Sequence, residues 1–230
     1  MREIRPMSLL IEAAVESLDD ARAAVAGGAD RLELCAELDV GGTTPPHALV
    51  ADVIARVEVP VLVMIRPHAG DFVYTRAERD RMCTDIGAVL ALGAAGVVLG
   101  ALDASRRVDL VATRELVAAA HGRPVTFHRA IDVTSDALEA IDALVSIGVS
   151  RALSSGAGPT ALDGADMLAA MVARAGDGLR IVAGGGVRAG NVATIVRRTG
   201  VREVHARCGG EERRIRAIAN AVESATASGE

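Results

Sequence analysis

Two kinds of segment alternate along the whole chain. Short runs rich in Val, Ile and Leu, typical of buried strands, alternate with longer segments of helical period rich in Ala, Arg and acidic residues. The pattern predicts strands at residues 8–13, 31–35, 59–65, 96–99, 124–128, 151–154, 180–183 and 203–206. It predicts helices at residues 17–27, 47–57, 76–92, 110–120, 135–148, 162–175, 189–198 and 211–225. The expected order is therefore strand then helix, repeated eight times.

This alternation predicts an α/β fold with a parallel sheet and right-handed crossovers. Eight strand–helix units in 230 residues favour a closed (β/α)8 barrel of the TIM type. An open doubly wound sheet is the alternative, because six clear strands would be enough for it. No linker, low-complexity stretch or charge run interrupts the pattern, so we expect a single domain over residues 1–230 with its core at about residues 8–225.

The composition narrows the classes of function. All 25 basic residues are arginines, because the chain contains no lysine. Chemistry through a lysine Schiff base is therefore excluded, and so is the P-loop motif, which needs a lysine. The net charge of −5 argues against nucleic acid as a general partner. Only three residues are aromatic, so the core must be aliphatic.

Cysteine usage and hydropathy both favour the cytoplasm. Cys35, Cys83 and Cys208 are too few and too scattered for a disulfide framework, which fits a reducing compartment. The first seven residues do not resemble a signal peptide, and no run of about 18 apolar residues predicts a membrane span. We therefore expect a cytoplasmic location and no membrane partner.

Unusual polar residues gather where the predicted strands end. In a (β/α)8 barrel, functional groups occupy the carboxyl ends of the strands and the loops that follow. The residues at those positions are Glu12, Glu33, Cys35, Arg66, His128, Arg129, Asp132, Ser155, Gly184, Gly185, Gly186, His205 and Cys208. We expect Glu33, Arg66, His128 and His205 to point into one shared pocket at this end of the barrel.

These residue types suit acid–base chemistry on a small anionic ligand. His128 is the candidate general acid or base, with Glu33 or Asp132 orienting it. Arg66 and Arg129 are candidates for binding a carboxylate or phosphate. The remaining candidates for contact with such a ligand are Glu12, Ser155, Gly184, Gly185, Gly186 and His205. The glycines follow the seventh predicted strand, where bare backbone N–H groups can hold an anion.

Structural roles remain open for some of the same residues. Arg31, Glu33 and Glu203 lie on neighbouring or near-neighbouring strands and are also compatible with an ion-pair network inside the barrel. His128 ends an apolar strand, where a single histidine is also compatible with the core.

A series of motifs resembles the CutC family. The motifs are Gly28-Ala29-Asp30-Arg31-Leu32-Glu33-Leu34-Cys35, Gly41-Gly42-Thr43-Thr44-Pro45, Met64-Ile65-Arg66-Pro67, Gly70-Asp71-Phe72-Val73-Tyr74, Pro124-Val125-Thr126-Phe127-His128-Arg129-Ala130-Ile131-Asp132, Ser154-Ser155-Gly156, Gly184-Gly185-Gly186-Val187 and Glu203-Val204-His205. The resemblance covers about residues 9–205. It implies a cytosolic TIM-type barrel, often a homodimer, with a role in copper homeostasis through handling of the cuprous ion.

The resemblance also implies a place for copper. Cys35 matches a cysteine proposed as a copper ligand in animal relatives, and Cu(I) prefers soft thiolate ligands. Those relatives have a partner cysteine just after the first strand, where this chain reads Glu12-Ala13-Ala14-Val15. Cys208 follows the strand that flanks the first strand on its other side, so it is the candidate second ligand.

Two further departures from the family concern the end of the barrel. Many relatives have two serines after the eighth-strand histidine, where this chain has Ala206-Arg207-Cys208. Relatives also carry a long segment before the last helix, where Gly209-Gly210 leads almost directly into it here.

Two functions therefore stand side by side, copper homeostasis through Cu(I) binding and an enzyme acting on a small anionic substrate. The family resemblance and Cys35 favour copper. The carboxylates and arginines at the strand ends favour an enzyme, because a copper carrier needs only two or three soft ligands. A purely structural or interaction protein is a third hypothesis. The concentration of polar residues at the strand ends argues against it.

Overall fold

The computed structural model describes residues 9–227, which alternate strands and helices. The strands are β1 (Leu10–Val15), β2 (Arg31–Leu34), β3 (Val61–Met64), β4 (Gly96–Leu99), β5 (Val125–Phe127), β6 (Arg151–Ser154), β7 (Arg180–Gly184) and β8 (Glu203–Arg207). The α-helices are α1 (Leu18–Ala26), α2 (His47–Ile54), α3 (Arg76–Ala91), α4 (Leu110–Ala119), α5 (Ala137–Ser146), α6 (Ala165–Ala175), α7 (Val192–Thr199) and α8 (Glu212–Ala227). Two 3-10 helices that were not predicted, η1 (Leu38–Val40) and η2 (Arg129–Val133), follow β2 and β5.

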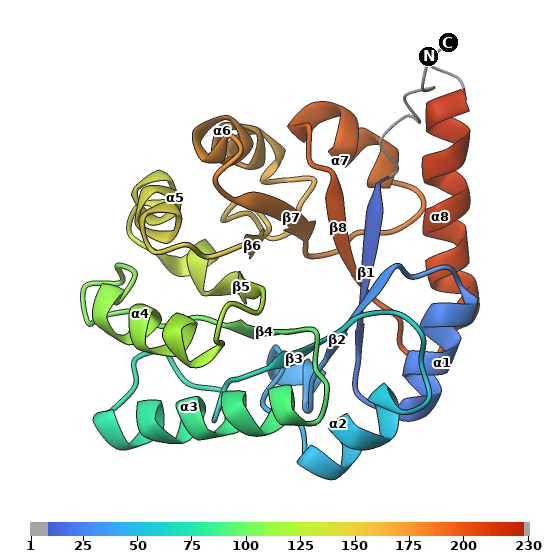
Figure 1. The fold of residues 1–230 in the computed structure, drawn as a ribbon. Coiled ribbons are helices and arrows are strands. Elements are labelled where there is room, and N and C mark those ends of the chain that lie inside the picture. The colour runs from blue at the N-terminus through green and yellow to red at the C-terminus, as the bar shows by residue number, and fades with distance from the viewer. Residues whose placement is uncertain (1–8, 228–230) are drawn as a thin grey trace, which may run out of the picture.

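The strands form a closed parallel barrel in chain order, with the helices around it (Figure 1). Pairing of β1 with β8 closes the ring and places Glu12 beside His205. The predicted (β/α)8 barrel is therefore confirmed, and the open doubly wound alternative is wrong. Residue 8, the predicted start of the first strand, lies outside the described residues, as do residues 1–7 and 228–230 of the predicted domain.

Local capping explains where several helices begin. Ser17 accepts a hydrogen bond from the Asp20 N–H at the start of α1. Thr75 and Glu78 form a reciprocal capping box at the start of α3. Each cap satisfies N–H groups that have no partner within the helix, so it fixes the first turn. No helix within residues 9–227 is long and apolar enough to cross a membrane.

Alternate residues of each strand face the helices or the barrel interior. On β2, Leu32 and Leu34 belong to the apolar layer that also contains Ala24 of α1 and Val50 of α2. The residues between them therefore face inward, because successive side chains of a strand point to opposite sides. Arg31 and Glu33 are both buried on that inner side.

The barrel interior contains a buried ion-pair network centred on Arg31. The Arg31 guanidinium donates to Glu12 at 2.5 Å and to Glu203 at 2.6 Å. Glu203 also accepts from Arg151 at 3.2 Å. The predicted network of Arg31 and Glu203 therefore forms, and it also includes Glu12 and Arg151. Glu33, the third predicted member, pairs with His205 instead.

The Arg31→Met substitution should destabilise the fold far more than loss of a surface arginine. It would leave Glu12 without its partner inside the barrel, and breaking a buried pair typically costs about 3–5 kcal/mol. Urea unfolding monitored by circular dichroism measures this change. The control is Arg76→Met on α3, whose side chain is 69 % exposed beside Asp80; its expected cost is below about 1 kcal/mol. Equal costs for the two variants would contradict the structural role of the network.

Candidate functional site at the barrel mouth

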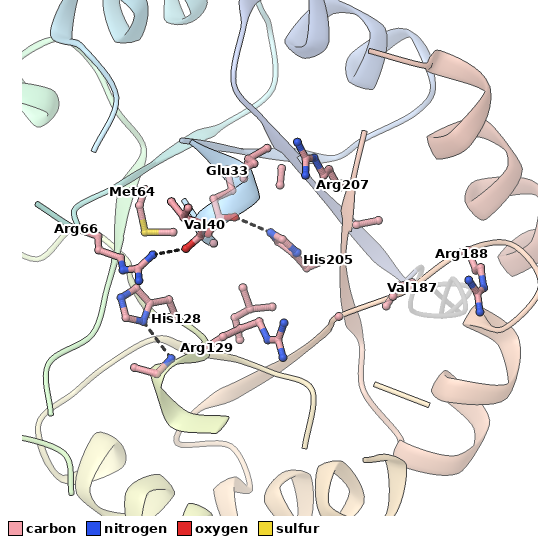
Figure 2. Close-up of a pocket in the computed structure, with 18 of the residues that line it drawn as sticks. Glu33, Val40, Met64, Arg66, His128, Arg129, Val187, Arg188, His205 and Arg207 are labelled. Carbon is pink, nitrogen blue, oxygen red and sulfur yellow. Dashed lines mark hydrogen bonds and ion pairs between the residues drawn. The ribbon is translucent and has the colours of Figure 1, made fainter. Parts of the chain in front are cut away.

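One pocket opens at the carboxyl ends of the strands. Its volume is about 640 Å³, within the range of small-molecule sites. The residues that line it are Ala14, Glu33, Leu38, Val40, Gly41, Met64, Arg66, Phe72, His128, Arg129, Ala130, Leu153, Gly185, Gly186, Val187, Arg188, His205, Ala206, Arg207 and Arg214. Glu33, Arg66, His128 and His205 therefore lie around one pocket (Figure 2).

Glu33 and His205 form a close pair across the mouth. The His205 Nε2 lies 2.6 Å from a Glu33 oxygen, and the two side chains are 14 % and 3 % exposed. Burial alone would raise the pKa of Glu33, but the charge and hydrogen bond of His205 outweigh it and lower that pKa. Burial alone would lower the pKa of His205, but Glu33 outweighs it and raises that pKa. The pair is therefore an ion pair with the proton on His205.

Glu12 lies beside this pair, opposite His205 in the strand register, and does not line the pocket. It is fully buried, and one of its oxygens accepts from Arg31. This corrects its expected role as a contact for an anionic ligand, because alternation on β1 directs it into the ion-pair network.

Among the described residues, Glu12, Glu33 and His205 form the one group of three whose possible metal-ligand atoms lie within 4.8 Å of one another. Three acidic and three basic side chains meet here: Glu12, Glu33, Glu203, Arg31, Arg151 and protonated His205. Their charges already balance, so a divalent cation would have to displace the His205 proton. The group is therefore better described as a structural ion-pair cluster than as a metal centre.

His128 is held by backbone and not by a carboxylate. Its Nδ1 accepts from the Ala130 N–H at 3.2 Å, and its Nε2 is buried without a hydrogen-bond partner among the described residues. Burial and the nearby Arg66 lower the pKa of His128 to about 4, so the ring is neutral with its proton on Nε2. Neither Glu33 nor Asp132 orients the ring, which corrects both expectations: Glu33 is paired with His205.

Gly100 makes room for the His128 ring. A Cβ at Gly100, just after β4, would lie 2.5 Å from a ring carbon of His128. Phe72 covers the ring from the loop after β3, with the two ring centroids 5.0 Å apart. The ring is therefore fixed from three sides and only its Nε2 side lacks a partner.

Arg66 ties two loops together at the rim. Its guanidinium donates to the carbonyls of Val40 and Gly42 at 3.0 and 2.9 Å. Its Cζ lies 4.8 Å from the centroid of the Phe72 ring. A third bond runs to the Gly70 carbonyl at 3.4 Å, so three of its five N–H donors are used within the chain. This makes Arg66 a weaker anion ligand than the sequence indicated.

Asp132 organises the loop after β6. It accepts hydrogen bonds from the Ser154 hydroxyl and from the N–H and hydroxyl of Ser155. It also accepts from Arg129 at 2.8 Å. Asp132 and Ser155 therefore do not line the pocket; both position Arg129, which does and whose side chain is 46 % exposed.

The three glycines after the seventh predicted strand have different roles. Gly184 ends β7, where a Cβ would lie 2.5 Å from Leu153. Gly185 and Gly186 line the pocket with φ angles of 99° and 70°, a left-handed conformation that favours glycine. The sequence "Gly-Gly-Gly" thus combines one packing position with two loop positions.

Cys35 and Cys208 do not meet. Cys35 follows Glu33 on the inward side and packs with Leu62, Met64 and Val98. Cys208 belongs to the helix-facing apolar layer, because on β8 the outward positions are Val204 and Ala206. The expected two-cysteine copper site is therefore not formed.

A soft sulfur of another kind lies beside Cys35 instead. Met64 lines the pocket and belongs to the same buried cluster as Cys35. Burial, followed by the charge of Glu33, raises the pKa of the Cys35 thiol well above its usual range. Met64 was not predicted as a site residue, although it ends β3 two positions after Leu62, which faces the barrel interior.

The comparisons with known proteins agree with this architecture. The model of the CutC family matches residues 9–210. The chain belongs to the CutC family. The protein named CutC of Caulobacter vibrioides is 47 % identical over 202 residues, which cover 88 % of this chain and 82 % of that protein. The CutC protein of Xanthomonas campestris is 46 % identical over 196 residues, which cover 85 % of this chain and 82 % of that protein.

Solved structures give the same result for the fold. A Streptococcus agalactiae protein, provisionally assigned as the copper homeostasis protein CutC, superposes with a TM-score of 0.82 at 35 % identity, over 86 % of this chain and 97 % of its own. A thiamine phosphate pyrophosphorylase from Pyrococcus furiosus superposes with a TM-score of 0.63 at 18 % identity, over 94 % of this chain and 96 % of its own. The second likeness shows the barrel fold alone.

The Glu33→Gln substitution should lower the pKa of His205. Without the Glu33 carboxylate, burial and the charge of Arg129 disfavour the protonated ring, and only the smaller effect of Glu12 favours it. In the wild type, the raised folded-state pKa stabilises the fold below pH 6.5, and this contribution is lost as the pH rises through that pKa. Two-dimensional NMR of the imidazole measures the titration.

The control for this titration is Glu37→Gln, a carboxylate in the loop after β2 that accepts from Thr43 and not from His205. It should leave the pKa of His205 unchanged. An unchanged pKa in Glu33→Gln as well would show that the pair does not carry the charge assigned to it.

Proposed function

We propose that this chain serves copper homeostasis by holding a Cu(I) ion at the wall of the barrel mouth, on the Cys35 Sγ and the Met64 Sδ. Membership of the CutC family supports this role, as does the name given to the Streptococcus agalactiae relative. Copper is the cargo in this proposal. The observation that carries it is the shared packing of a thiol and a thioether side chain in one buried cluster beside the pocket, both of them under Gly42.

Thiolate and thioether sulfurs suit Cu(I), which is a soft ion. Of the other described cysteines and methionines, Cys208 faces the helices, and Cys83, Met82, Met167 and Met171 lie on α3 and α6. Cys35 and Met64 are therefore the soft pair that neighbours the mouth. Cys35 directly follows β2 and Met64 ends β3, and these two strands are adjacent in the ring.

A backbone segment covers both sulfur-bearing side chains. A Cβ at Gly42 would lie 3.2 Å from the Cys35 Sγ and 3.3 Å from the terminal methyl carbon of Met64. The Gly42 carbonyl is held by Arg66, so this cover is tied to the rim of the pocket. An ion that enters through the mouth meets Met64 first, because Met64 lines the pocket while Cys35 is fully buried behind it.

Binding requires the Cys35 thiol to lose its proton, since the thiolate is the ligand. The raised pKa of this thiol keeps it protonated at neutral pH in the free protein. Cu(I) would form the Cu–S bond as the S–H bond breaks, and the Glu33 carboxylate beside the thiol is the nearest group to accept the proton. Free thiols persist in a reducing compartment, so we place this function in the cytoplasm.

Substitution of either sulfur ligand should weaken Cu(I) binding. Under anaerobic, reducing conditions with a competing Cu(I) chelator, Cys35→Ser should lose the ion to the chelator. Met64→Leu, which conserves volume, should bind about tenfold more weakly because one ligand is lost. The absorbance of the copper–chelator complex measures the transfer.

The matched controls are Cys208→Ser and Cys83→Ser, which remove thiols on the helix side of the barrel. Both should keep wild-type affinity. If Cys35→Ser and Met64→Leu compete as well as the wild type, or if all three cysteine variants lose affinity equally, this site is not the copper site.

A further inference from the structure

The wall of the mouth opposite Cys35 and Met64 is rich in hydrogen-bond donors. Figure 2 shows Met64 and Glu33 on one side of the pocket and Arg129 and Val187 on the other. This second wall consists of η2, Leu153 of β6 and the loop after β7. None of its donors is used by the copper proposal.

The loop after β7 presents unused backbone N–H groups. The N–H groups of Gly185, Gly186 and Val187 donate no hydrogen bond to any residue in the described range 9–227. Their neighbouring carbonyls are occupied: the Gly185 carbonyl accepts from Ala161 at 2.8 Å, and the Gly186 carbonyl accepts from Asn191 at 2.9 Å. These bonds fix the peptide planes of a loop that lines the pocket and leads towards α7.

Positive charge lies on the same wall. A Cβ at Gly185 would lie 3.6 Å from the Arg129 Cζ, so this guanidinium sits directly over the loop. Asp132 and Ser155 hold Arg129 in that position. Arg188 also lines the pocket, is exposed, and forms no ion pair with another described residue. Consecutive N–H groups beside a guanidinium are a typical arrangement for binding an oxyanion.

A buried donor completes the wall. The His128 side of the pocket adjoins Arg129, and His128 is 4 % exposed with its Nε2 unpartnered. A buried donor without a partner costs free energy, so it favours a ligand that brings an acceptor oxygen. Leu153 and Val187 supply apolar surface beside it.

We infer that the mouth binds a small organic phosphate monoester, with its phosphate on the N–H groups of residues 185–187 and the Arg129 guanidinium, and with an oxygen of its organic part on the His128 Nε2. A phosphate suits this wall better than a carboxylate, because three terminal oxygens can accept from more donors than two. Arg129 and Arg188 against the single carboxylate of Asp132 also leave this wall with a net positive charge, which favours an anion. This binding function is separate from the copper proposal.

Calorimetric titration of the copper-free protein tests the inference with three probes. These are inorganic phosphate, glycerol phosphate, and glycerate as a carboxylate of similar size. We expect millimolar or tighter binding of both phosphates and weaker binding of glycerate. Arg129→Gln should weaken both phosphates by about tenfold, the usual effect of losing one charge-assisted contact. Arg188→Gln should weaken both by a smaller factor, because it removes a positive charge at the rim without removing a contact.

His128→Phe separates the two parts of the ligand. It keeps an aromatic ring against Phe72 and removes the donor, so glycerol phosphate should bind more weakly while inorganic phosphate is unaffected. The control is Arg180→Gln, at the opposite end of β7, which should change nothing.

Three results would overturn the inference. They are no binding of either phosphate at millimolar concentration, binding that both arginine variants leave intact, and glycerate binding as tight as glycerol phosphate. Because Arg188 is exposed and makes no ion pair among the described residues, its variant remains informative even if Arg129→Gln does not fold. Cu(I) titration of Arg188→Gln should match the wild type, which keeps this result distinct from that of the copper proposal.

Discussion

The buried ion pairs of Arg31 with Glu12 and Glu203 govern the rest of the barrel. A guanidinium inside an aliphatic barrel is tolerated only when its charge is compensated, so Arg31 must face inward where both carboxylates meet it. Since side chains of a strand alternate, this placement also turns Glu33 and Cys35 inward. The same interaction that stabilises the interior therefore selects which β2 side chains reach the mouth.

The mouth combines two walls of different chemistry in one pocket. Cys35, directly after β2, and Met64, at the end of β3, place a thiol and a thioether in one buried cluster on one side. Arg129 and the loop after β7 present a guanidinium and backbone N–H groups. The Glu33–His205 ion pair joins β2 to β8. With the proton on His205, the two side chains form an internal acid–base couple. The two proposed ligands thus use different groups and do not compete for the same donors.

The alternation of strands and helices predicted the fold. It also predicted that Glu33, Arg66, His128 and His205 gather at one mouth, because each lies near the carboxyl end of a strand. Partner choice could not be predicted in the same way. Asp132 bonds the Ser154–Ser155 loop and not His128, because η2 turns it towards β6. The orientation of Cys208 was predicted wrongly because Cys208 was treated as part of a loop. The alternation of β8 continues from Val204 and Ala206 to Cys208, so its side chain faces the helices. Met64 was overlooked although the same alternation places it beside Arg66 on the inner side.

The central claim is that Cys35 and Met64 together bind Cu(I). Copper-edge X-ray absorption of the Cu(I)-loaded protein prepared with selenomethionine tests it most directly, because selenium at Met64 would scatter differently from the Cys35 sulfur. If Cys35 and Met64 hold the ion, the copper has one sulfur and one selenium neighbour, and the selenium signal is lost in Met64→Leu. A copper surrounded by nitrogen and oxygen alone, or a selenium signal that survives in Met64→Leu, would contradict it.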